Sequence, residues 1–352
     1  MPSQSSIPLS PALSLDQCNK QELTGVSLAG KNVIITGGAS GVGASLAETY
    51  AEKGAYVNIV DINEELGLKH AASLQERGYH AQFVLTDLTS WPSQVAAFKA
   101  AVRFHPAHVL HAVVTCAGLL GSPFITPDEE SLSPSTALDA AADIPPTPDT
   151  SALAVNALAL HYTAKLAQLY FELPPSTASD GTNGHTNGAE EVYHKHLTVF
   201  LSMLTYVDFP NSAAYTASKH AARGLFRILR PLFAARGHRV NAVAPWLTRT
   251  PMTDGSKGGK EAPDLCGLFH AVGCPVAEDT GVVVRAVRVL EEGGVVGRVL
   301  GAGPDRVWDL KDDFEGRDGA EGTEYFHREV LPGWYDYAEK MRLLIEGEGP
   351  KA

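Results

Sequence analysis

The feature that most constrains the fold is an apolar run that leads directly into a glycine-rich turn. Residues 31–36 (KNVIIT) contain an unbroken apolar run, which is typical of a strand covered on both faces of a parallel sheet. The turn at 37–43 follows, then a helical pattern to about Lys53, and then a second apolar strand, 56–60, that ends in Asp61. Strand, glycine turn, helix, strand and acid in this order predict a dinucleotide-binding βαβ unit.

Each part of this unit has a physical reason for binding a dinucleotide. Glycines allow a tight turn and a close approach of the backbone to the pyrophosphate, while the helix N-terminus presents free N–H groups and its positive dipole end. Asp61 is placed to accept hydrogen bonds from the adenosine ribose, and its charge would repel a 2′-phosphate. Because the turn contains no Arg or Lys to attract that phosphate, we predict NAD(H) rather than NADP(H) as the cofactor.

The same alternation of buried strands and helices continues along the chain. The five strands expected after the first two lie at 82–86, 109–116, 197–204, 239–244 and 297–300. Helices are expected at 64–77, 93–104, 151–173, 221–233 and 278–292. Under the right-handed crossover rule this pattern predicts an α/β fold, a single Rossmann-type domain over residues 29–303. Its sheet is expected to be doubly wound, with seven parallel strands and helices on both faces.

Segments of different composition interrupt and flank this domain. Residues 1–28 form a polar arm that we expect to be flexible, and 304–352 form an aromatic-rich C-terminal extension. The proline-rich insertion at 121–150 leaves the carboxyl end of a strand, so it is either a flap over the active site or a disordered insertion. The insertion at 174–196 is expected to be a flexible loop on the opposite side, and 253–276 a mobile lid over the substrate.

A second group of residues carries the candidate chemistry. Tyr215 and Lys219 are four residues apart on a predicted helix, so their polar ends share one face. A free tyrosine has a pKa near ~10, and a nearby ammonium lowers it toward the range useful for acid/base catalysis. Ser202, at the end of the preceding strand, could hydrogen-bond a carbonyl oxygen that the tyrosine protonates. An isolated pair of this kind is usually a surface feature, but the dinucleotide unit upstream favours catalysis.

Composition limits the partners and the compartment. The net charge of −12 argues against nucleic acid or an anionic membrane surface as the main partner, and no apolar run is long enough to span a membrane. The N-terminal sequence does not resemble a secretory signal, and four widely spaced cysteines suit a reducing compartment, so we expect a cytoplasmic protein. His194 and His196 have no carboxylate or cysteine at metal-ligand spacing, so we expect no metal site.

Taken together, these motifs resemble those of the short-chain dehydrogenase/reductases, over roughly residues 28–303. The matching residues, whose joint order and spacing make the resemblance specific, are Thr36-Gly37-x-x-x-Gly41-x-Gly43, Asp61, Asp87, Ala117-Gly118, Asn156, Ser202, Tyr215-x-x-x-Lys219, Asn241-x-x-x-Pro245 and Thr250. The sequence at 244–246 is also similar to NAD-dependent, 15-hydroxyprostaglandin-dehydrogenase-like members from fungi.

The resemblance implies a role for each matched residue. Tyr215 would be the acid/base, and Ser202 would orient and polarise the substrate oxygen. Lys219 would hold the nicotinamide ribose and lower the pKa of the tyrosine, while Asn156 would support a water-linked proton relay. Cofactor contacts are implied for Gly37, Ser40, Gly41, Val42, Gly43, Asp61, Ile62, Asp87, Leu88, Ala117, Gly118, Tyr215, Lys219, Pro245, Leu247 and Thr250.

The sequence departs from the family pattern in two places. Thr115-Cys116 replaces the usual Asn-Asn, which removes side chains that normally brace the fourth strand and the adenine pocket. Trp246 replaces the glycine that usually follows Pro245, and its ring either lines the substrate or nicotinamide site or simply packs in the interior. Neither change affects the proton-transfer group.

The sequence thus favours an NAD(H)-dependent alcohol dehydrogenase or ketone reductase acting on a lipophilic small molecule of secondary metabolism. The apolar residues expected to flank the reacting centre are Leu204, Val207, Phe209 and Trp246. Two alternatives stay open: a cofactor-binding protein that templates a non-redox reaction such as a cyclisation, and a regulatory dinucleotide sensor. The resemblance also implies a homodimer or homotetramer formed through the helices at 151–172 and 212–236.

Overall fold

A computed structural model of the chain describes residues 9–20, 27–122, 147–174, 195–209, 212–256, 264–313 and 316–345. These residues form one eight-stranded sheet in the order β3-β2-β1-β4-β5-β6-β7-β8. All neighbouring strands are parallel except β7 and β8. The strands are β1 (Asn32–Thr36), β2 (Tyr56–Asp61), β3 (Ala81–Leu85), β4 (Ala112–Thr115), β5 (His196–Phe200), β6 (Arg239–Pro245), β7 (Val299–Ala302) and β8 (Val307–Asp309).

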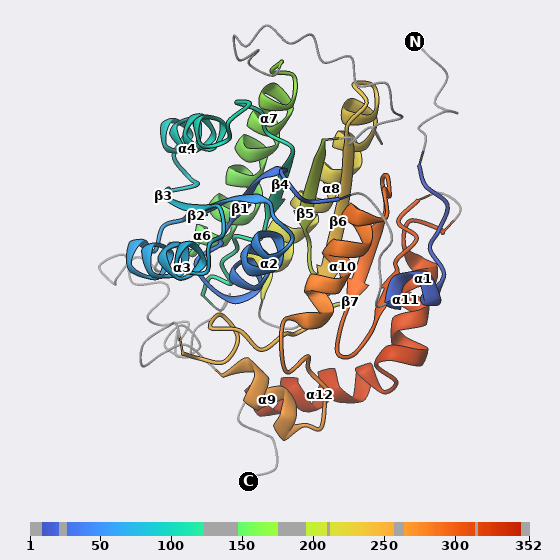
Figure 1. Cartoon of the computed structure of the whole chain (residues 1–352). Coiled ribbons are helices and arrows are strands. Elements are labelled where there is room, and N and C mark those ends of the chain that lie inside the picture. Colours follow the sequence, from blue (N-terminus) through green and yellow to red (C-terminus); the bar gives the residue numbers. More distant parts are fainter. Residues whose placement is uncertain are drawn as a thin grey trace, which may run out of the picture.

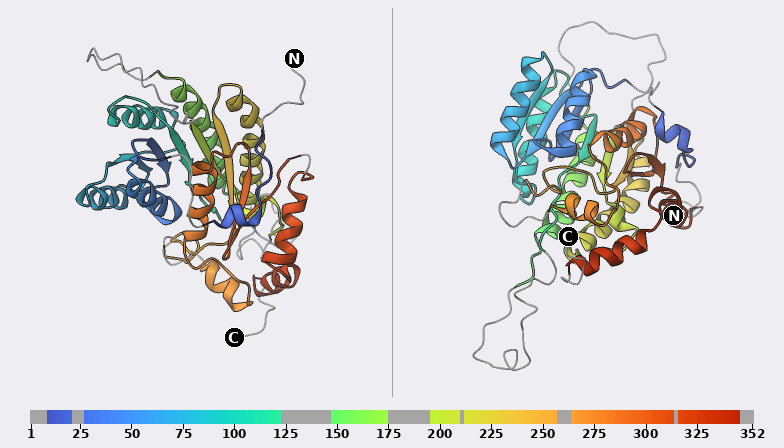
Figure 2. Two further views of the ribbon diagram at one scale, coloured as in Figure 1. Left: turned by 45° about the vertical axis from the view of Figure 1, so that its right-hand side comes forward. Right: turned by 90° about the horizontal axis from the view of Figure 1, so that it is seen from below.

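Helices cover both faces of the sheet, as Figure 1 and Figure 2 show. The apolar core of one face contains side chains of α2, α3 and α10, and the core of the other contains side chains of α4, α7 and α8. The bounds of these helices are α2 (Gly41–Glu52), α3 (Glu64–Glu76), α4 (Trp91–Phe104), α7 (Leu160–Phe171), α8 (Ala213–Ala234) and α10 (Gly281–Glu292). The predicted Rossmann-type α/β architecture is confirmed.

The strand order fixes where a ligand can bind. The chain starts at β1 in the middle of the sheet and builds outward in both directions, so the order reverses between β1 and β4. A crevice opens outside the carboxyl ends of the strands at such a reversal, because the connections leave toward opposite faces. The glycine turn follows β1 and the loop at 116–122 follows β4, so both lie at this crevice.

The edge beyond β7 differs from the expected seven-stranded sheet. β8 runs antiparallel to β7, and all three of its residues are buried. Gly301 makes room for this strand, because a Cβ atom there would lie 2.4 Å from the Trp308 ring. The prediction of seven strands, all parallel, was therefore wrong in one respect, because it lacked this eighth, antiparallel strand. Three residues are too few to show a strand pattern in the sequence.

The N-terminal segment closes the same edge. Helix α1 (Leu15–Asn19) begins with a capping box in which Ser14 and Gln17 bond each other's backbone N–H groups. Its Cys18 is fully buried. The Asn19 amide donates to the Val307 carbonyl at 2.8 Å and accepts from the Val307 N–H at 2.9 Å. Residues 9–20 are thus docked on β8 and differ from the flexible arm expected for residues 1–28.

The C-terminal extension packs on the domain through α11 (Ala320–Tyr325), η5 (Phe326–Val330) and α12 (Trp334–Ile345). A buried ionic contact ties its start to the rest of the protein. Asp312 is 2% exposed and receives hydrogen bonds of 2.8 Å from the Arg223 guanidinium of α8 and from the Tyr206 hydroxyl. Removing two opposite charges from water is costly unless they are paired this closely, so Asp312 fixes the extension against α8.

The expected insertions fall largely outside the described residues. Residues 123–146 of the flap, 175–194 of the second loop and 257–263 of the lid are among the residues that the structure leaves out. The described part of the lid contains α9 (Leu265–Ala271), which contacts α12. The expectations of a flap at 121–150 and a flexible loop at 174–196 stay predictions.

Candidate active site

A cavity of about 1010 Å³ lies outside the carboxyl ends of the central strands. Its wall includes residues from the glycine turn, from the ends of β2, β4, β5 and β6, and from α8 and α9. Every residue for which cofactor contact is predicted lines it: Gly37, Ser40, Gly41, Val42, Gly43, Asp61, Ile62, Asp87, Leu88, Ala117, Gly118, Tyr215, Lys219, Pro245, Leu247 and Thr250. One continuous cavity therefore joins the predicted dinucleotide site to the predicted proton donor.

The glycine turn is shaped by close backbone contacts. Gly37 has φ +68°, and a Cβ atom there would lie 2.7 Å from the Ala117 Cα. At Gly43 a Cβ atom would lie 2.2 Å from the carbonyl oxygen of Gly37. Any larger residue would push the turn away from α2 and from the β4 loop. The turn thus keeps the α2 N-terminus open to the cavity, where an anionic group would be stabilised by the helix dipole.

The Asp61 carboxylate is held at the end of β2. One oxygen accepts from the Ala39 N–H at 3.0 Å and the other from the Asn63 N–H at 3.0 Å. The residue is 7% exposed and lines the cavity. These two bonds fix the orientation of a negative charge beside the glycine turn.

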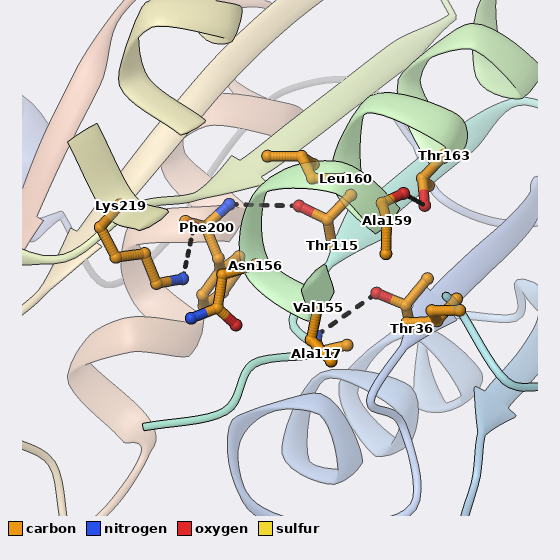
Figure 3. A pocket seen from close by; sticks show the side chains of 11 residues that line it. Thr36, Thr115, Ala117, Val155, Asn156, Ala159, Leu160, Thr163, Phe200 and Lys219 are labelled. Carbon is orange, nitrogen blue, oxygen red and sulfur yellow. Dashed lines mark hydrogen bonds between the residues drawn. The ribbon is translucent and has the colours of Figure 1, made fainter. Parts of the chain in front are cut away.

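Tyr215, Lys219 and Ser202 meet in this cavity from two elements. Tyr215 and Lys219 lie one turn apart on α8, with the lysine Nζ 5.7 Å from the tyrosine ring centroid. The Nζ donates to the Phe200 carbonyl at the end of β5, at 2.9 Å (Figure 3). Ser202 caps the short helix η3 (Met203–Thr205) directly after β5, so strand and helix ends bring the three side chains together.

Burial shifts the pKa values of both Tyr215 and Lys219. It raises the pKa of Tyr215 above the ordinary phenol value, and the hydrogen bond with Ser202 acts in the opposite direction. Burial also lowers the pKa of Lys219 to about 8, against a smaller contribution from Cys116. We expected the lysine charge to lower the tyrosine pKa. The net change is upward instead, because taking the phenolate out of water is the largest effect.

Asn156 lies at an irregular point of the helix expected at 151–173. Helix α6 (Ser151–Leu153) widens into the π-helix η2 (Ala154–Ala159) before α7 begins. The Asn156 amide donates to the Leu119 carbonyl at 2.8 Å and to the Ser218 hydroxyl at 2.9 Å, and its oxygen accepts from the Leu119 N–H. Sequence reasoning missed Ser218, although it directly precedes Lys219 in the motif.

Asn156 does not line the large cavity. It lines a small adjoining pocket together with Lys219, Thr36 and Thr115 (Figure 3). The volume of about 10 Å³ is close to the space that a single water molecule occupies. Of these three residues, Asn156 therefore lines only the small pocket and Tyr215 only the large cavity, whereas Lys219 lines both.

The predicted substrate residues separate into two groups. Leu204, Phe209 and Trp246 line the large cavity, whereas Val207 is 6% exposed, lies in the core and does not line it. The sequence missed Phe269 of α9, which does line the cavity. The Trp246 indole N–H donates to the Pro275 carbonyl at 3.0 Å, so this residue both packs in the interior and borders the cavity.

Comparison with known proteins identifies the family. A short chain dehydrogenase family model matches residues 31–141, and a model described as enoyl-(acyl carrier protein) reductase matches 193–278. The chain is 35% identical to 5′-hydroxyaverantin dehydrogenase of Dothistroma septosporum, over 84% of this chain and 91% of that protein. The chain belongs to the short-chain dehydrogenase/reductase family. The predicted resemblance to this family is thereby confirmed, and the protein is an oxidoreductase. The similarity to NAD-dependent, 15-hydroxyprostaglandin-dehydrogenase-like members stays a prediction.

Other similar proteins extend the comparison. A second 5′-hydroxyaverantin dehydrogenase, from Emericella nidulans, is 34% identical over 85% of this chain and 92% of its own length. An NADP-dependent dehydrogenase of Phoma sp. is 30% identical over 78% of this chain and 74% of its length. The crystal structure of gox2181 has a TM-score of 0.59 at 22% identity and covers 79% of this chain and 96% of its own, which shows a shared fold.

The short-chain dehydrogenase/reductases bind a nicotinamide cofactor, and this chain has residues that fit one. The close contacts at Gly37 and Gly43 leave no side chain where a pyrophosphate would lie against α2. At the fourth strand, Thr115 bonds to two backbone groups of β5, donating to the Thr198 carbonyl and accepting from the Phe200 N–H, each at 3.2 Å. Thr115 therefore braces β4 to β5, although the usual asparagine pair is missing.

Among the described residues, no three His, Cys, Asp or Glu side chains gather as a metal site. His196 is fully buried in β5, and His194 is outside the described residues. Of the helices in the described ranges, none combines the length and apolar character that crossing a membrane requires.

Proposed function

We propose that this enzyme transfers a hydride between NAD(H) and a secondary alcohol or ketone of a lipophilic small molecule of secondary metabolism. The observation that carries the proposal is the single cavity that contains the glycine turn, Ser202, Tyr215 and Lys219. The apolar residues Leu204, Phe209 and Trp246 in the same cavity support a lipophilic substrate. The names of the two 5′-hydroxyaverantin dehydrogenases support an alcohol group as the reacting function.

The proposed chemistry assigns one task to each side chain. The bound cofactor supplies the hydride chemistry. Tyr215 accepts the alcohol proton during oxidation and donates it during reduction, while the Ser202 hydroxyl donates to the same substrate oxygen. Lys219 in its charged form favours the phenolate, and its pKa of about 8 means that both of its protonation states are populated near neutral pH.

NAD(H) is proposed over NADP(H) because of Asp61. Its carboxylate is oriented by two backbone N–H groups and lies where the adenosine ribose is expected. A 2′-phosphate would bring a second negative charge against it. Two relatives are named NADP-dependent, so the Kd values for NAD and NADP are to be compared on this chain itself.

We also propose that the enzyme works in the cytoplasm. All four cysteines are free thiols, which suits a reducing compartment. A fluorescent fusion with the tag in a loop far from the cavity would show the location, and an organellar signal would contradict the proposal.

The proposed function is tested by following NADH formation over a panel of hydrophobic secondary alcohols. Tyr215→Phe should lower kcat about 100-fold or more, because it removes the acid/base group. The Kd for NAD should change by less than about twofold, since the ring stays in place. Tyr56→Phe is the matched control, because Tyr56 stacks on His80 and does not line the cavity. Undiminished turnover by Tyr215→Phe would remove the assigned acid/base.

A further inference from the structure

Three aromatic side chains form one part of the cavity wall. Phe209 follows η3, Trp246 follows β6 and Phe269 belongs to α9, and all three line the cavity. The Phe209 and Phe269 rings are nearly parallel, with 24° between their planes and centroids 5.6 Å apart. The Trp246 and Phe269 rings meet edge to face at 5.7 Å. We call these three side chains the aromatic wall.

A second layer of aromatic residues supports this wall from the C-terminal extension. Trp334, the first residue of α12, is 3% exposed and does not line the cavity. Its ring centroid lies 5.2 Å from that of Trp246, edge to face, and 6.5 Å from that of Phe209, nearly parallel. Trp334 therefore contacts two of the three rings of the wall from behind.

Phe326 adds a second support to the same tryptophan. It is fully buried in η5, and its ring centroid lies 5.2 Å from that of Trp246. Trp246 also lies close to the backbone of Gly303, because a Cβ atom there would lie 3.0 Å from the Trp246 Cβ. Close packing of this kind leaves the indole little freedom to turn.

The extension is fixed to the catalytic helix independently of these rings. Arg223, one turn beyond Lys219 on α8, makes two hydrogen bonds to Asp312, at 2.8 and 2.9 Å. Burial alone would raise the pKa of Asp312, but the hydrogen bonds and charge of Arg223 bring it below its ordinary value, so the pair is ionic. Asp312 thus ties the extension that carries Phe326 and Trp334 to the helix that carries Tyr215 and Lys219.

We propose that Trp334 is a specificity-determining positioning residue, and that the wall it supports selects substrates with an aromatic ring system beside the reacting alcohol or ketone. This inference rests on the proposed function. Aromatic rings attract one another in offset-stacked and edge-to-face arrangements, so a substrate ring gains most from a wall whose rings are already held in place. A small aliphatic alcohol gains little from the same wall.

The test compares two alcohols, sec-butanol and a naphthyl-substituted ethanol, at saturating NAD. For the wild type, kcat/KM should favour the naphthyl alcohol. Trp334→Ala and Trp334→Leu should lower that preference about 10-fold or more, mainly through KM for the naphthyl alcohol, because the wall loses its support. Trp334→Phe keeps a ring and should retain most of the preference. The Leu and Phe variants keep more of the buried apolar volume than Trp334→Ala does, so they decide the question if Trp334→Ala does not fold.

Tyr325→Ala is the matched control, because it removes a ring of the same extension that packs on Trp308 and makes no ring contact with the wall. It should leave the preference unchanged. Three results would each overturn the inference. In the Trp334 variants, kcat/KM could fall equally for both alcohols, or the preference could be unchanged in both the Ala and the Leu variant. The third such result is a wild type with no preference for the naphthyl alcohol. NAD binding without hydride transfer from either alcohol would instead overturn the proposed function, and the inference with it.

Discussion

At the scale of single residues, Ser202 and Tyr215 are coupled by a hydrogen bond that favours the ionised phenol. Burial opposes ionisation, so the Ser202 hydroxyl is the group that keeps the tyrosine pKa from rising further. Alcohol oxidation needs the phenolate, and its rate should therefore rise with pH as Tyr215 loses its proton.

Ser202→Ala should move the rising limb of the pH profile for alcohol oxidation to higher pH. The expected displacement is roughly one pH unit or more, since a hydrogen bond to a charged group contributes about 1.5–3 kcal/mol. The measurement is kcat/KM against pH for wild type and variant. A limb that stays in place or moves to lower pH would show that Ser202 does not stabilise the phenolate.

Asp61 carries the prediction on cofactor choice. Wild type should bind NAD at least about 10-fold more tightly than NADP, because a phosphate beside a fixed carboxylate is repelled. Asp61→Ser should bring the Kd values for NAD and NADP closer together, because it weakens the binding of NAD and strengthens the binding of NADP. Asp305→Asn, an exposed carboxylate in the β7–β8 turn, serves as the control. Equal Kd values of the two cofactors for the wild type would contradict the assigned role of Asp61.

At the scale of elements, α10 carries a buried carboxyl group beside β5. Glu291 is 1% exposed, and its carboxyl lies 3.8 Å from the Nδ1 of the fully buried His196. Burial raises the pKa of Glu291 to about 8, with a further contribution from the charge of Glu292, and burial lowers the pKa of His196 well below its ordinary value. Both groups are therefore mostly uncharged at neutral pH.

This raised pKa makes stability depend on pH. A carboxyl that holds its proton more tightly when folded contributes stability that is fully present below pH 4.5 and is lost as the pH rises through about 8. The free energy of unfolding should fall by about 1.4 kcal/mol per pH unit within that window from this group. In Glu291→Gln, which cannot ionise, the decline between pH 5 and pH 8 should be smaller.

Denaturant unfolding of wild type and Glu291→Gln at pH 5 and pH 8 measures how far the free energy of unfolding declines in each. Glu324→Gln is the control, because Glu324 is an exposed carboxylate of α11 paired with Arg317 at 2.8 Å, and its replacement should leave the decline in stability between pH 5 and pH 8 unchanged. An identical pH dependence in wild type and Glu291→Gln would contradict the prediction.

The elements also show which parts of the structure can be predicted from the sequence. The parallel strands are mostly apolar because both of their faces are covered, and this pattern is visible without a structure. Strand β8 and helix α1 are short and gain their burial from distant partners. For α1 a signal existed, the Ser14-x-x-Gln17 capping box, but the Ser- and Pro-rich surroundings outweighed it.

Site residues divide in the same way. The glycine turn, Ser202 and the Tyr215–Lys219 pair follow from local spacing, since a turn or a helix fixes their relation. Val207 was expected beside the substrate, but the short helix η3 directs it into the core. Phe269 lines the cavity and Trp334 packs behind its wall through contacts between residues far apart in the sequence, which no local pattern reveals.

At the scale of the whole molecule, α7 and α8 present apolar side chains to solvent. Leu169 is 49% exposed on α7, while Ile228 is 63% and Leu232 43% exposed on α8. Gly224, one turn before Ile228, has open space where a Cβ atom would lie, so another helix could approach closely. These features suit the homodimer or homotetramer that the family resemblance implies, and we propose that the copies associate through this helical layer.

Replacing both Leu169 and Ile228 by Glu should convert the assembly to monomers, because two charges on each copy would be buried without partners. Sedimentation equilibrium gives the mass of wild type and variant. Leu68→Glu is the control, since Leu68 is 54% exposed on α3, in the opposite helical layer, and its replacement should leave the mass unchanged. A wild type that sediments as a monomer would contradict the proposal.

The docking of α1 on β8 has a consequence for how copies can assemble. A free outer strand offers unpaired backbone groups to any neighbouring chain. Here the Asn19 amide occupies both backbone groups of Val307, and an Asp309 carboxylate oxygen accepts the Leu13 N–H at 2.9 Å. A second molecule therefore finds no vacant hydrogen-bonding positions at Val307, and this end of the sheet is protected from strand-by-strand polymerisation while the helical surface stays available for association.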